Sequence, residues 1–348
     1  MSLIPFLHRV SERRDLTCEE ALEAMDAILN GRASPPQIAG FLVALRMKGE
    51  TVEELVGFAR AMRRMAQPVD VRVEGSPLLD TCGTGGDGAG TFNISTVAAF
   101  VAAGAGARVA KHGNRSLSSQ CGSADLLECL GVRVPMELPL AARAIREIGI
   151  GFLFAPAVHT AMKHAQPVRA ELKMRTVFNL LGPLTNPAGA TAQLVGAPSE
   201  RAAELMARAL AALGLERGFV VHGSDGLDEI TTTGPTLAYE IRSGTVERRV
   251  LDPADFGVAT AIANDVKGGS KELNTGIARA VLQGTHGAPR DIVLVNASAA
   301  LVAVGLAADF DDGMRRAARS IDSGAASSKL SELARFSTKP QMNTDERR

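Results

Sequence analysis

Apolar residues in the first seventy positions recur with the spacing of an α-helix. Three helix starts carry side chains that can cap a first turn: Thr17 with Glu20, Ser34 followed by Pro35, and Thr51 with Glu54. Short amphipathic helices of this kind cannot bury all of their apolar faces against one another. We therefore predict a small all-helical N-terminal domain, residues 1–70, whose remaining apolar surface is covered by another helix or by a second subunit.

Beyond Pro68 the pattern changes to short apolar runs that alternate with Gly-rich turns and Ala-rich helical stretches. The predicted strands span residues 78–80, 108–111, 151–154, 193–195 and 219–222. The predicted helices span residues 95–103, 124–130, 140–148, 200–213, 272–283 and 297–306. Because strands and helices alternate, we predict an α/β fold in which the larger domain has a mainly parallel central sheet flanked by helices.

Two stretches depart from this alternation. Residues 236–251, which turn at Ser243-Gly244, predict a peripheral antiparallel hairpin. Residues 160–173 have helix-like sequence without a strand partner, and we expect them to return to the helical domain. The predicted boundaries are 1–70, joined by about 160–185, for the helical domain, then 74–159 and 186–337 for the α/β domain, and 338–348 for a polar tail.

Composition and charge narrow the range of partners. The 348-residue chain has 38 basic and 38 acidic residues, whereas a non-specific nucleic-acid-binding protein normally has a basic excess. Its four cysteines form no CxxC pair, which argues against a zinc knuckle or a disulfide framework. No apolar stretch is long enough for a signal peptide or a membrane span. We expect a cytoplasmic protein with neither a nucleic-acid nor a membrane partner.

Five glycines crowd a loop at residues 80–96, between a predicted strand and a predicted helix. Glycines let a backbone turn tightly and expose its N–H groups. Asn93, Ser95 and Thr96 then lead into the helix, and a helix N-terminus is a favourable seat for phosphate. The spacing is neither that of a Walker loop nor the GxGxxG of dinucleotide-binding proteins. The alternative is a glycine turn with an ordinary cap, but the number of glycines and the embedded Asp87 favour a phosphate-binding loop.

A second polar turn, residues 111–119, follows the next predicted strand. Loops at the carboxyl ends of neighbouring parallel strands meet over one crevice. Lys111, Asn114, Arg115 and three serines could therefore add cationic and hydroxyl ligands to the same phosphates. The alternative is a solvated surface turn. Ser123, at the start of the following helix, is either a plain cap or a further anion ligand.

Five segments in order give the chain a family resemblance from about Leu3 to Leu333. They are GTGGD with FNIST, KHGNR, GSADLLE, TVFNLLGPLTNP and the pair Asp228-Glu229. In these segments the chain resembles the anthranilate phosphoribosyltransferases. The resemblance implies a small helical domain, a larger sheet domain and a homodimer formed through the helical domain. It also implies transfer of the 5-phosphoribosyl group from phosphoribosyl pyrophosphate (PRPP) to the amine of anthranilate, giving N-(5-phosphoribosyl)anthranilate and pyrophosphate, in the second step of tryptophan biosynthesis from chorismate.

The same resemblance implies roles for individual residues. PRPP would be bound by Gly83, Gly86, Asp87, Thr91, Asn93, Ile94, Ser95, Thr96, Lys111, His112, Gly113, Asn114, Arg115, Ser116, Leu117, Ser118, Ser119 and Ser123. Anthranilate would be received by Gly83, Asn114 and Arg169, with His112 and His159 nearby. One or two Mg²⁺ ions would be held by Ser95, Asp228 and Glu229.

Physical chemistry agrees with these roles, although each residue has a plainer alternative. Adjacent carboxylates suit Mg²⁺, but most such pairs in loops are simply solvated. Arg169 could bind both oxygens of the anthranilate carboxylate, but a lone arginine is more often a surface charge. His112 and His159 are as readily packed bystanders. No catalytic nucleophile is evident, so we expect catalysis by positioning and electrostatics, with Lys111 in support.

Departures from the family pattern and two rival functions complete the sequence-based interpretation. Relatives usually carry Ala-Val at Ser116-Leu117, Lys-Ser at Gln120-Cys121 and Pro at Thr160; the loss of a lysine charge at position 120 predicts weaker diphosphate binding.

One rival is a pyrimidine nucleoside phosphorylase, which shares the architecture but usually adds a C-terminal domain that we do not expect here. The other is a non-enzymatic or nucleic-acid-binding relative, against which the zero net charge argues.

Overall fold

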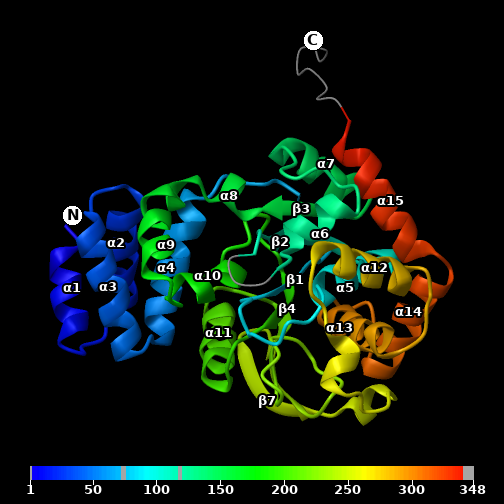
Figure 1. Ribbon diagram of the computed structural model, residues 1–348. Helices are drawn as coiled ribbons and strands as arrows, with labels where there is room; N and C mark the ends of the chain where they lie inside the picture. The colour runs from blue at the N-terminus through cyan, green and yellow to red at the C-terminus, as the bar shows by residue number, and fades with distance from the viewer. Residues whose placement is uncertain (1, 72–75, 117–119, 340–348) are drawn as a thin grey trace.

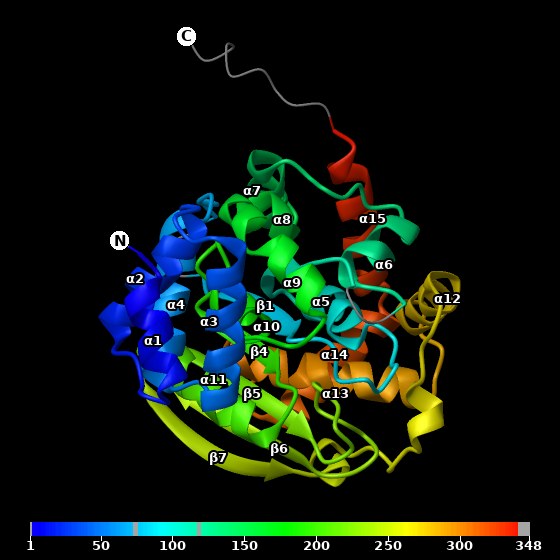
Figure 2. The ribbon, with the colours of Figure 1, turned by 60° about the vertical axis from the view of Figure 1, so that its left-hand side comes forward.

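The computed structural model describes residues 2–71, 76–116 and 120–339. Figure 1 shows a group of N-terminal helices on one side, a central sheet, and a second group of helices on the other side; Figure 2 brings the N-terminal helices forward. The predicted fold class, a small helical part with a larger sheet domain, is confirmed. None of the helices in the described ranges combines the length and the apolar character that a membrane crossing requires.

The N-terminal part consists of α1 (Ile4–Ser11), α2 (Cys18–Leu29), α3 (Pro35–Lys48) and α4 (Val52–Met65). The predicted caps of α2 and α4 are present, because Thr17 and Thr51 accept the N–H of Glu20 and Glu54. At the core of this bundle Phe41 and Phe58 meet edge to face, with 6.1 Å between ring centroids.

Within the described residues, seven strands form one sheet in the order β3-β2-β1-β4-β5-β6-β7. Their bounds are β1 Leu78–Gly83, β2 Arg108–Gly113, β3 Ile150–Phe154, β4 Ala192–Gly196, β5 Arg217–Gly223, β6 Thr236–Arg242 and β7 Thr245–Leu251. The pairs among β1–β5 are parallel, as predicted, whereas β6 and β7 are antiparallel and close one edge. Ser243 and Gly244 turn the hairpin with φ of 45° and 87°, the left-handed pair that a tight type I′ turn needs.

The remaining helices cover the sheet. They are α5 Ile94–Gly104, α6 Ser123–Cys129, α7 Leu138–Glu147, α8 Ala155–Val158, η1 Thr160–His164, α9 Gln166–Leu172, α10 Phe178–Leu184, α11 Glu200–Ala212, η2 Pro253–Phe256, η3 Ala263–Val266, α12 Lys271–Leu282, α13 Ala288–Ala303, α14 Phe310–Asp322 and α15 Ala325–Ser337. One apolar cluster joins β1–β3 to α5, α13, α14 and α15, and a second joins α1–α4 to α9, α10, α11 and the central strands. The sheet is therefore covered on both faces.

Two helical predictions need comment. Residues 160–173 form η1 and α9, and their Ala165 and Val168 are buried in the apolar cluster that contains α1–α4, α11 and parts of the central strands. The predicted start of a helix at Ala297 is wrong, because α13 begins at Ala288. Almost every side chain of α13 is buried, so its sequence lacks the polar face that marks a surface helix.

Candidate functional site

The carboxyl end of β1 marks the point where the strand order reverses. From β1 the sheet continues to β2 and β3 on one side, and to β4 and β5 on the other. Loops that leave parallel strands at such a point diverge and open a crevice for ligands. The glycine-rich loop follows β1, the second polar turn begins at the end of β2, and Asp228 and Glu229 follow β5. All three predicted segments therefore lie at one edge of the sheet.

Backbone hydrogen bonds join the acidic pair to the glycine-rich loop. Oδ2 of Asp228 accepts the N–H of Gly85 at 2.8 Å, and the N–H of Asp228 reaches Oδ2 of Asp87 at 3.5 Å. Oε1 of Glu229 accepts the N–H of Ser95 in the first turn of α5 at 3.1 Å. The structure thus brings together the acidic pair, the glycine turn and the start of α5, which are distant in sequence.

Two glycines at the strand ends make room for Asp228. Gly83 of β1 pairs in register with Gly196 of β4. A Cβ on Gly83 would lie 2.6 Å from Oδ2 of Asp228, and a Cβ on Gly196 would lie 1.5 Å from its backbone oxygen. Gly196 was not among the predicted site residues, but its closeness to Asp228 makes a glycine necessary there.

The acidic pair lies in a buried position that disfavours its charged form. Burial raises the pKa of Glu229 to about 7. Burial, and then repulsion from Glu229 and Asp87, raises the pKa of Asp228 well above its usual range. A divalent cation between these carboxylates would favour their charged forms. Mg²⁺ typically takes one or two carboxylates and completes its shell with water and substrate phosphate, so the residues present fit that ion.

Lys111 brings positive charge to this pair, and its charge acts against the effect of burial on the pKa of Glu229. Its Nζ donates a hydrogen bond to the carbonyl of Thr81 and lies 3.5 Å from Oγ of Ser95. Burial lowers the pKa of Lys111, whereas the charges of Asp80 and Glu229 raise it. The ammonium group therefore lies next to Ser95 in the first turn of α5, where it can balance the negative charge of Glu229.

The glycine-rich loop is joined to the segment just after the second polar turn, and that turn is joined to the start of α6. The side-chain amide of Asn93 donates to the carbonyl of Cys121 at 3.0 Å, and the N–H of Asn114 donates to Oγ of Ser123 at 3.2 Å. The guanidinium of Arg115 is engaged in two ion pairs, with Glu128 at 2.6 Å and with Asp125 at 3.1 Å. Leu117, Ser118 and Ser119 lie outside the described residues.

Other predicted PRPP contacts differ in what they can offer. Ile94 and Thr96 are each 1% exposed, and their N–H groups donate to the carbonyls of Phe92 and Asn93, so in this structure they offer little to a ligand. Thr91 forms an isolated antiparallel bridge with Lys267, which fixes the far end of the glycine-rich loop. Ser116 donates its N–H to Oδ2 of Asp125 at 3.4 Å.

His112 and His159 form a buried pair with 5.2 Å between ring centroids. Burial lowers the pKa of His112 to about 3 and that of His159 to about 4, so both rings are neutral at pH 7. Nδ1 of His112 lies 3.2 Å from the carbonyl of Gly182 in α10, a partner that calls for a proton on this nitrogen. Nε2 of each ring is buried and has no hydrogen-bond partner among the described residues. Two polar atoms are thus left for a ligand.

Arg169 lies on α9, with its guanidinium carbon 5.2 Å from the ring centroid of Phe178 at the start of α10. Its Nη1 also donates weakly to Gln166 at 3.4 Å. Since α10 carries the Gly182 carbonyl that faces His112, the histidine pair and Arg169 flank the same short helix. Neither contact is an ion pair, so the guanidinium keeps its charge for another partner.

Asp80 and Asn186, which were not among the predicted site residues, hold the ends of the strands together by hydrogen bonds. Oδ1 of buried Asp80 accepts the N–H of His112 at 3.1 Å, and Oδ2 accepts the side-chain amide of Asn186 at 2.8 Å. Asn186 also donates to the carbonyl of Ala110. The segment TVFNLLGPLTNP contains Asn186 and was the available signal, but its local sequence gives no hint of a partner in β1.

Arg175 was also missed, although it contacts the glycine-rich loop directly. Its Nη1 donates to the carbonyls of Gly85 at 2.6 Å and Gly86 at 2.8 Å. Arg175 immediately precedes the motif that begins at Thr176. An arginine in a connecting segment has no local feature that reveals a contact 90 residues away.

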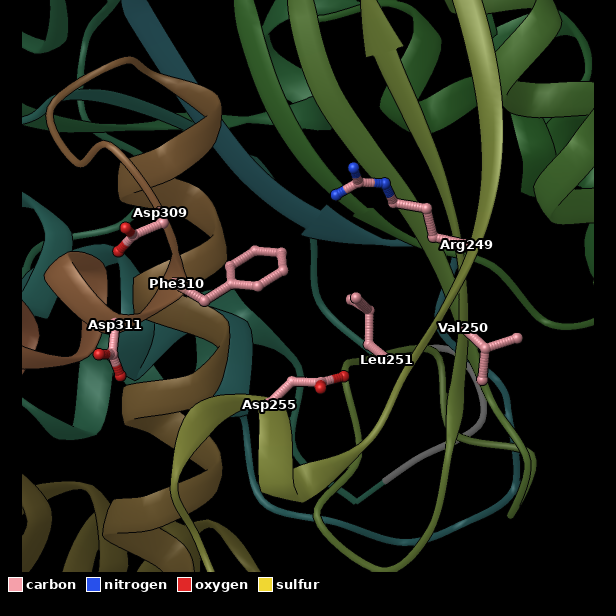
Figure 3. Close-up of a pocket in the computed structure, with 7 residues that line it drawn as sticks. All are labelled: Arg249, Val250, Leu251, Asp255, Asp309, Phe310 and Asp311. Atoms are coloured by element: carbon pink, nitrogen blue, oxygen red, sulfur yellow. The ribbon is translucent and has the colours of Figure 1, made fainter.

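A separate hollow of about 530 Å³ lies between β7, η2 and the start of α14 (Figure 3). Its lining residues are Arg249, Val250, Leu251, Asp255, Asp309, Phe310 and Asp311. Their charged groups have structural partners, since Arg249 pairs with Glu240 and Asp309 caps α14 through the N–H of Asp312. None of the predicted site residues lines this hollow.

Comparison with known proteins agrees with the two-part organisation. Residues 75–327 match the model of the glycosyl transferase family, a/b domain. Residues 4–66 match the model of the glycosyl transferase family, helical bundle domain. Both matches are to domains of glycosyltransferases.

Individual relatives are similar along nearly the whole chain. Anthranilate phosphoribosyltransferase of Solibacter usitatus is 69% identical over 336 residues, which cover 97% of this chain and 99% of that protein. The crystal structure of anthranilate phosphoribosyltransferase from Thermus thermophilus has a TM-score of 0.90 at 45% identity and covers 96% of this chain and 99% of that one. The Saccharomyces cerevisiae enzyme, solved in complex with PRPP and Mg, has a TM-score of 0.86 at 27% identity, with 96% and 97% covered. The resemblance carried by the sequence motifs is confirmed, and the chain belongs to the anthranilate phosphoribosyltransferase family of glycosyltransferases.

Proposed function

We propose that this chain transfers the 5-phosphoribosyl group of PRPP to the amine of anthranilate, giving N-(5-phosphoribosyl)anthranilate and pyrophosphate. One observation carries the proposal at the level of the site. Hydrogen bonds to Gly85 and Ser95 join the Asp228-Glu229 pair to a glycine-rich loop at the switch point of the sheet. Phosphate-binding backbone and metal-binding carboxylates in one place suit a magnesium diphosphate substrate.

On this proposal the diphosphate lies against the glycine-rich loop and the start of α5. The N–H groups of the glycine-rich turn would bind its oxygens, together with Asn114 from the second turn and Ser123 at the start of α6. Ser95, Asp228 and Glu229 would hold one or two Mg²⁺ ions. Bound Mg²⁺ would offset the negative charge that develops on the departing pyrophosphate. Lys111, behind Ser95, would add a fixed positive charge to the same region.

Anthranilate would bind between the histidine pair, Arg169 and Asn114, with Gly83 at the floor. The guanidinium of Arg169 has the planar geometry that binds both oxygens of a carboxylate. Nε2 of His112 would accept a hydrogen bond from the amine, because the Gly182 carbonyl holds the proton of that ring on Nδ1. A pKa of about 3 makes His112 a weak base, so its role would be to orient the amine and not to remove its proton.

The reaction needs no nucleophile from the protein, because the amine of the acceptor attacks C1 of the ribose. As the bond to pyrophosphate breaks, positive charge grows on the sugar ring and negative charge grows on the leaving oxygens. Catalysis would come from alignment of the two substrates and from fixed dipoles aimed at the leaving group.

A fluorescence assay of N-(5-phosphoribosyl)anthranilate formation tests the function. We expect product only when PRPP, anthranilate and Mg²⁺ are all present. Phosphorolysis of a pyrimidine nucleoside by inorganic phosphate, without this product, would favour a nucleoside phosphorylase instead. Binding to duplex DNA with no product from either reaction would favour a non-enzymatic relative.

We also propose that two copies associate through the helical domain. Ile4 of α1 is 44% exposed and Met47 of α3 is 71% exposed, and α1 packs on α3. Exposed large apolar side chains are a common feature of subunit interfaces. Light scattering should give twice the chain mass, and Met47→Glu should shift the protein toward the monomer. A monomeric parent protein at micromolar concentration would contradict this proposal.

A further inference from the structure

Arg175 connects the helical domain to the glycine-rich loop. It lies in the segment between α9 and α10, outside any helix or strand. Its Nη1 donates to the carbonyls of Gly85 and Gly86, and its own carbonyl accepts a hydrogen bond from Nη1 of Arg46 on α3. A continuous line of contacts therefore runs from α3 through Arg175 to the turn at residues 83–87.

The two carbonyls that accept hydrogen bonds from Arg175 fix the direction of the N–H groups that follow them in the chain. In a trans peptide the carbonyl and the N–H of the next residue point in opposite directions. The carbonyls of Gly85 and Gly86 face Arg175, so the N–H groups of Gly86 and Asp87 point away from it. Gly85 and Gly86 have φ of 64° and 70°, and such consecutive left-handed residues have many alternative conformations open to them. A specific partner is needed to select one.

The turn is held from two sides. Asp228 accepts the N–H of Gly85, and Arg175 donates to the carbonyl of the same residue. Phosphate is bound by N–H groups and repelled by carbonyl oxygens, so a loop that engages its carbonyls elsewhere is better prepared for an anion.

The guanidinium of Arg175 is suited to this task. Nη2 is buried and has no hydrogen-bond partner among the described residues, while Nη1 makes both bonds to the turn. Burial lowers the pKa of the guanidinium, and the nearby charges of Asp228 and Asp87 oppose that effect. An arginine remains charged under such conditions and donates from a rigid, planar group.

We propose that Arg175 is a positioning residue that sets the conformation of residues 83–87 for the diphosphate half of the substrate. This inference rests on the proposed function. Arg175 acts on the backbone of the loop and not on the anthranilate pocket, so its loss should affect the two substrates unequally.

Steady-state kinetics of Arg175→Ala test the inference. We expect the KM for PRPP to rise about tenfold or more, with the KM for anthranilate and kcat at saturating PRPP changed by less than about threefold. Arg175→Lys keeps the charge without the planar fork and should restore part of the lost affinity. Arg208→Ala is the matched control, because the exposed side chain of Arg208 lies on α11 and pairs with Glu204 one turn away. It should leave both KM values unchanged.

Calorimetric binding of magnesium pyrophosphate separates this inference from the proposed function. The parent protein and Arg208→Ala should bind the probe alike, and Arg175→Ala should bind it about tenfold more weakly. A parent protein that binds the probe but forms no product would contradict the proposed function. The difference in probe affinity between that protein and Arg175→Ala would still test the role of Arg175. Equal affinity of the parent and Arg175→Ala, or equal rises in both KM values, would overturn the role of Arg175. If Arg175→Ala does not fold, Arg175→Lys and Arg46→Ala test the same line of contacts.

Discussion

The N–H of Ser95 donates a 3.1 Å hydrogen bond to Oε1 of Glu229, across 134 positions of the chain. A helix N-terminus normally offers its first N–H groups to an anion, and here one of them is already occupied by a carboxylate of the protein. On the function that we propose, Glu229 would lie where a substrate phosphate and a metal ion meet. That relationship makes the acidic pair the first target for mutation.

Asp228→Asn combined with Glu229→Gln should lower magnesium-dependent turnover by about a hundredfold or more, because neutral amides replace two charged oxygen ligands. Initial rates over a magnesium titration measure the effect. Asp311→Asn is a suitable control, since Asp311 is an exposed carboxylate paired with Arg315 on α14. A magnesium titration that is identical for the double variant and the parent would exclude the pair as ligands.

Arg169→Ala should raise the KM for anthranilate by about tenfold or more and leave that for PRPP nearly unchanged, because a carboxylate loses its bidentate partner. Arg169→Lys should recover little of this affinity, since an ammonium group cannot reproduce the planar fork. Both constants come from initial rates with the second substrate saturating. Equal increases in the two KM values would remove Arg169 from the acceptor pocket. Together with the opposite pattern expected of Arg175→Ala, this variant separates the two halves of the site.

The histidine pair predicts a loss of stability in acid. His112 and His159 have folded-state pKa values of about 3 and about 4, below the 6.5 of a free histidine. Between these values the unfolded chain takes up protons and the folded chain does not, so stability is complete above about pH 6.5 and falls as the pH decreases. At pH 5 each histidine should cost about 2 kcal/mol of unfolding free energy.

Urea unfolding at pH 7.5 and pH 5 measures this effect. Other titrating groups contribute to the difference, so the parent is compared with His112→Asn and His159→Asn. Each variant should lose about 2 kcal/mol of the pH-dependent difference, whatever its stability at pH 7.5. A difference that is the same in all three proteins would show that the histidines are not responsible.

Gly196→Ala should disrupt the site, because its Cβ would overlap the backbone oxygen of Asp228 at 1.5 Å. We expect a loss of about 1–3 kcal/mol in stability and a large loss of activity, since Asp228 must move. Gly276→Ala in α12 is the control: its Cβ would meet open space, and a helical alanine should be neutral or stabilising by up to about 1 kcal/mol. Thermal unfolding and turnover of both variants decide the point. Unchanged activity in Gly196→Ala would mean that the position of Asp228 is not critical.

The parallel sheet was predictable because each of its strands is a short apolar run bounded by glycine or polar turns, a pattern that reports local structure. The helix α13 was predicted only in its second half, because burial on every side removes the alternation on which such predictions depend. The helices α14 and α15 were not predicted, although Asp309 caps α14 in an ordinary way.

The site was predictable where chemistry and position coincide in one segment. Glycine-rich and cationic loops after consecutive strands had to meet at one edge of the sheet, and the motif resemblance named Asp228 and Glu229. Arg175, Asp80 and Gly196 were missed for a common reason. Each matters through a partner that is distant in the sequence, and sequence periodicity carries no information about such pairs.

The edge strand β7 has a consequence for assembly. Figure 2 shows β7 along one side of the sheet, beyond β6, and its exposed residues include Glu247, Arg248 and Arg249. Charged side chains on a border strand oppose the addition of a strand from another molecule, because their solvation would be lost. Fibrous, open-ended growth is therefore disfavoured at this border, and the dimer that we propose would form through the helical domain instead.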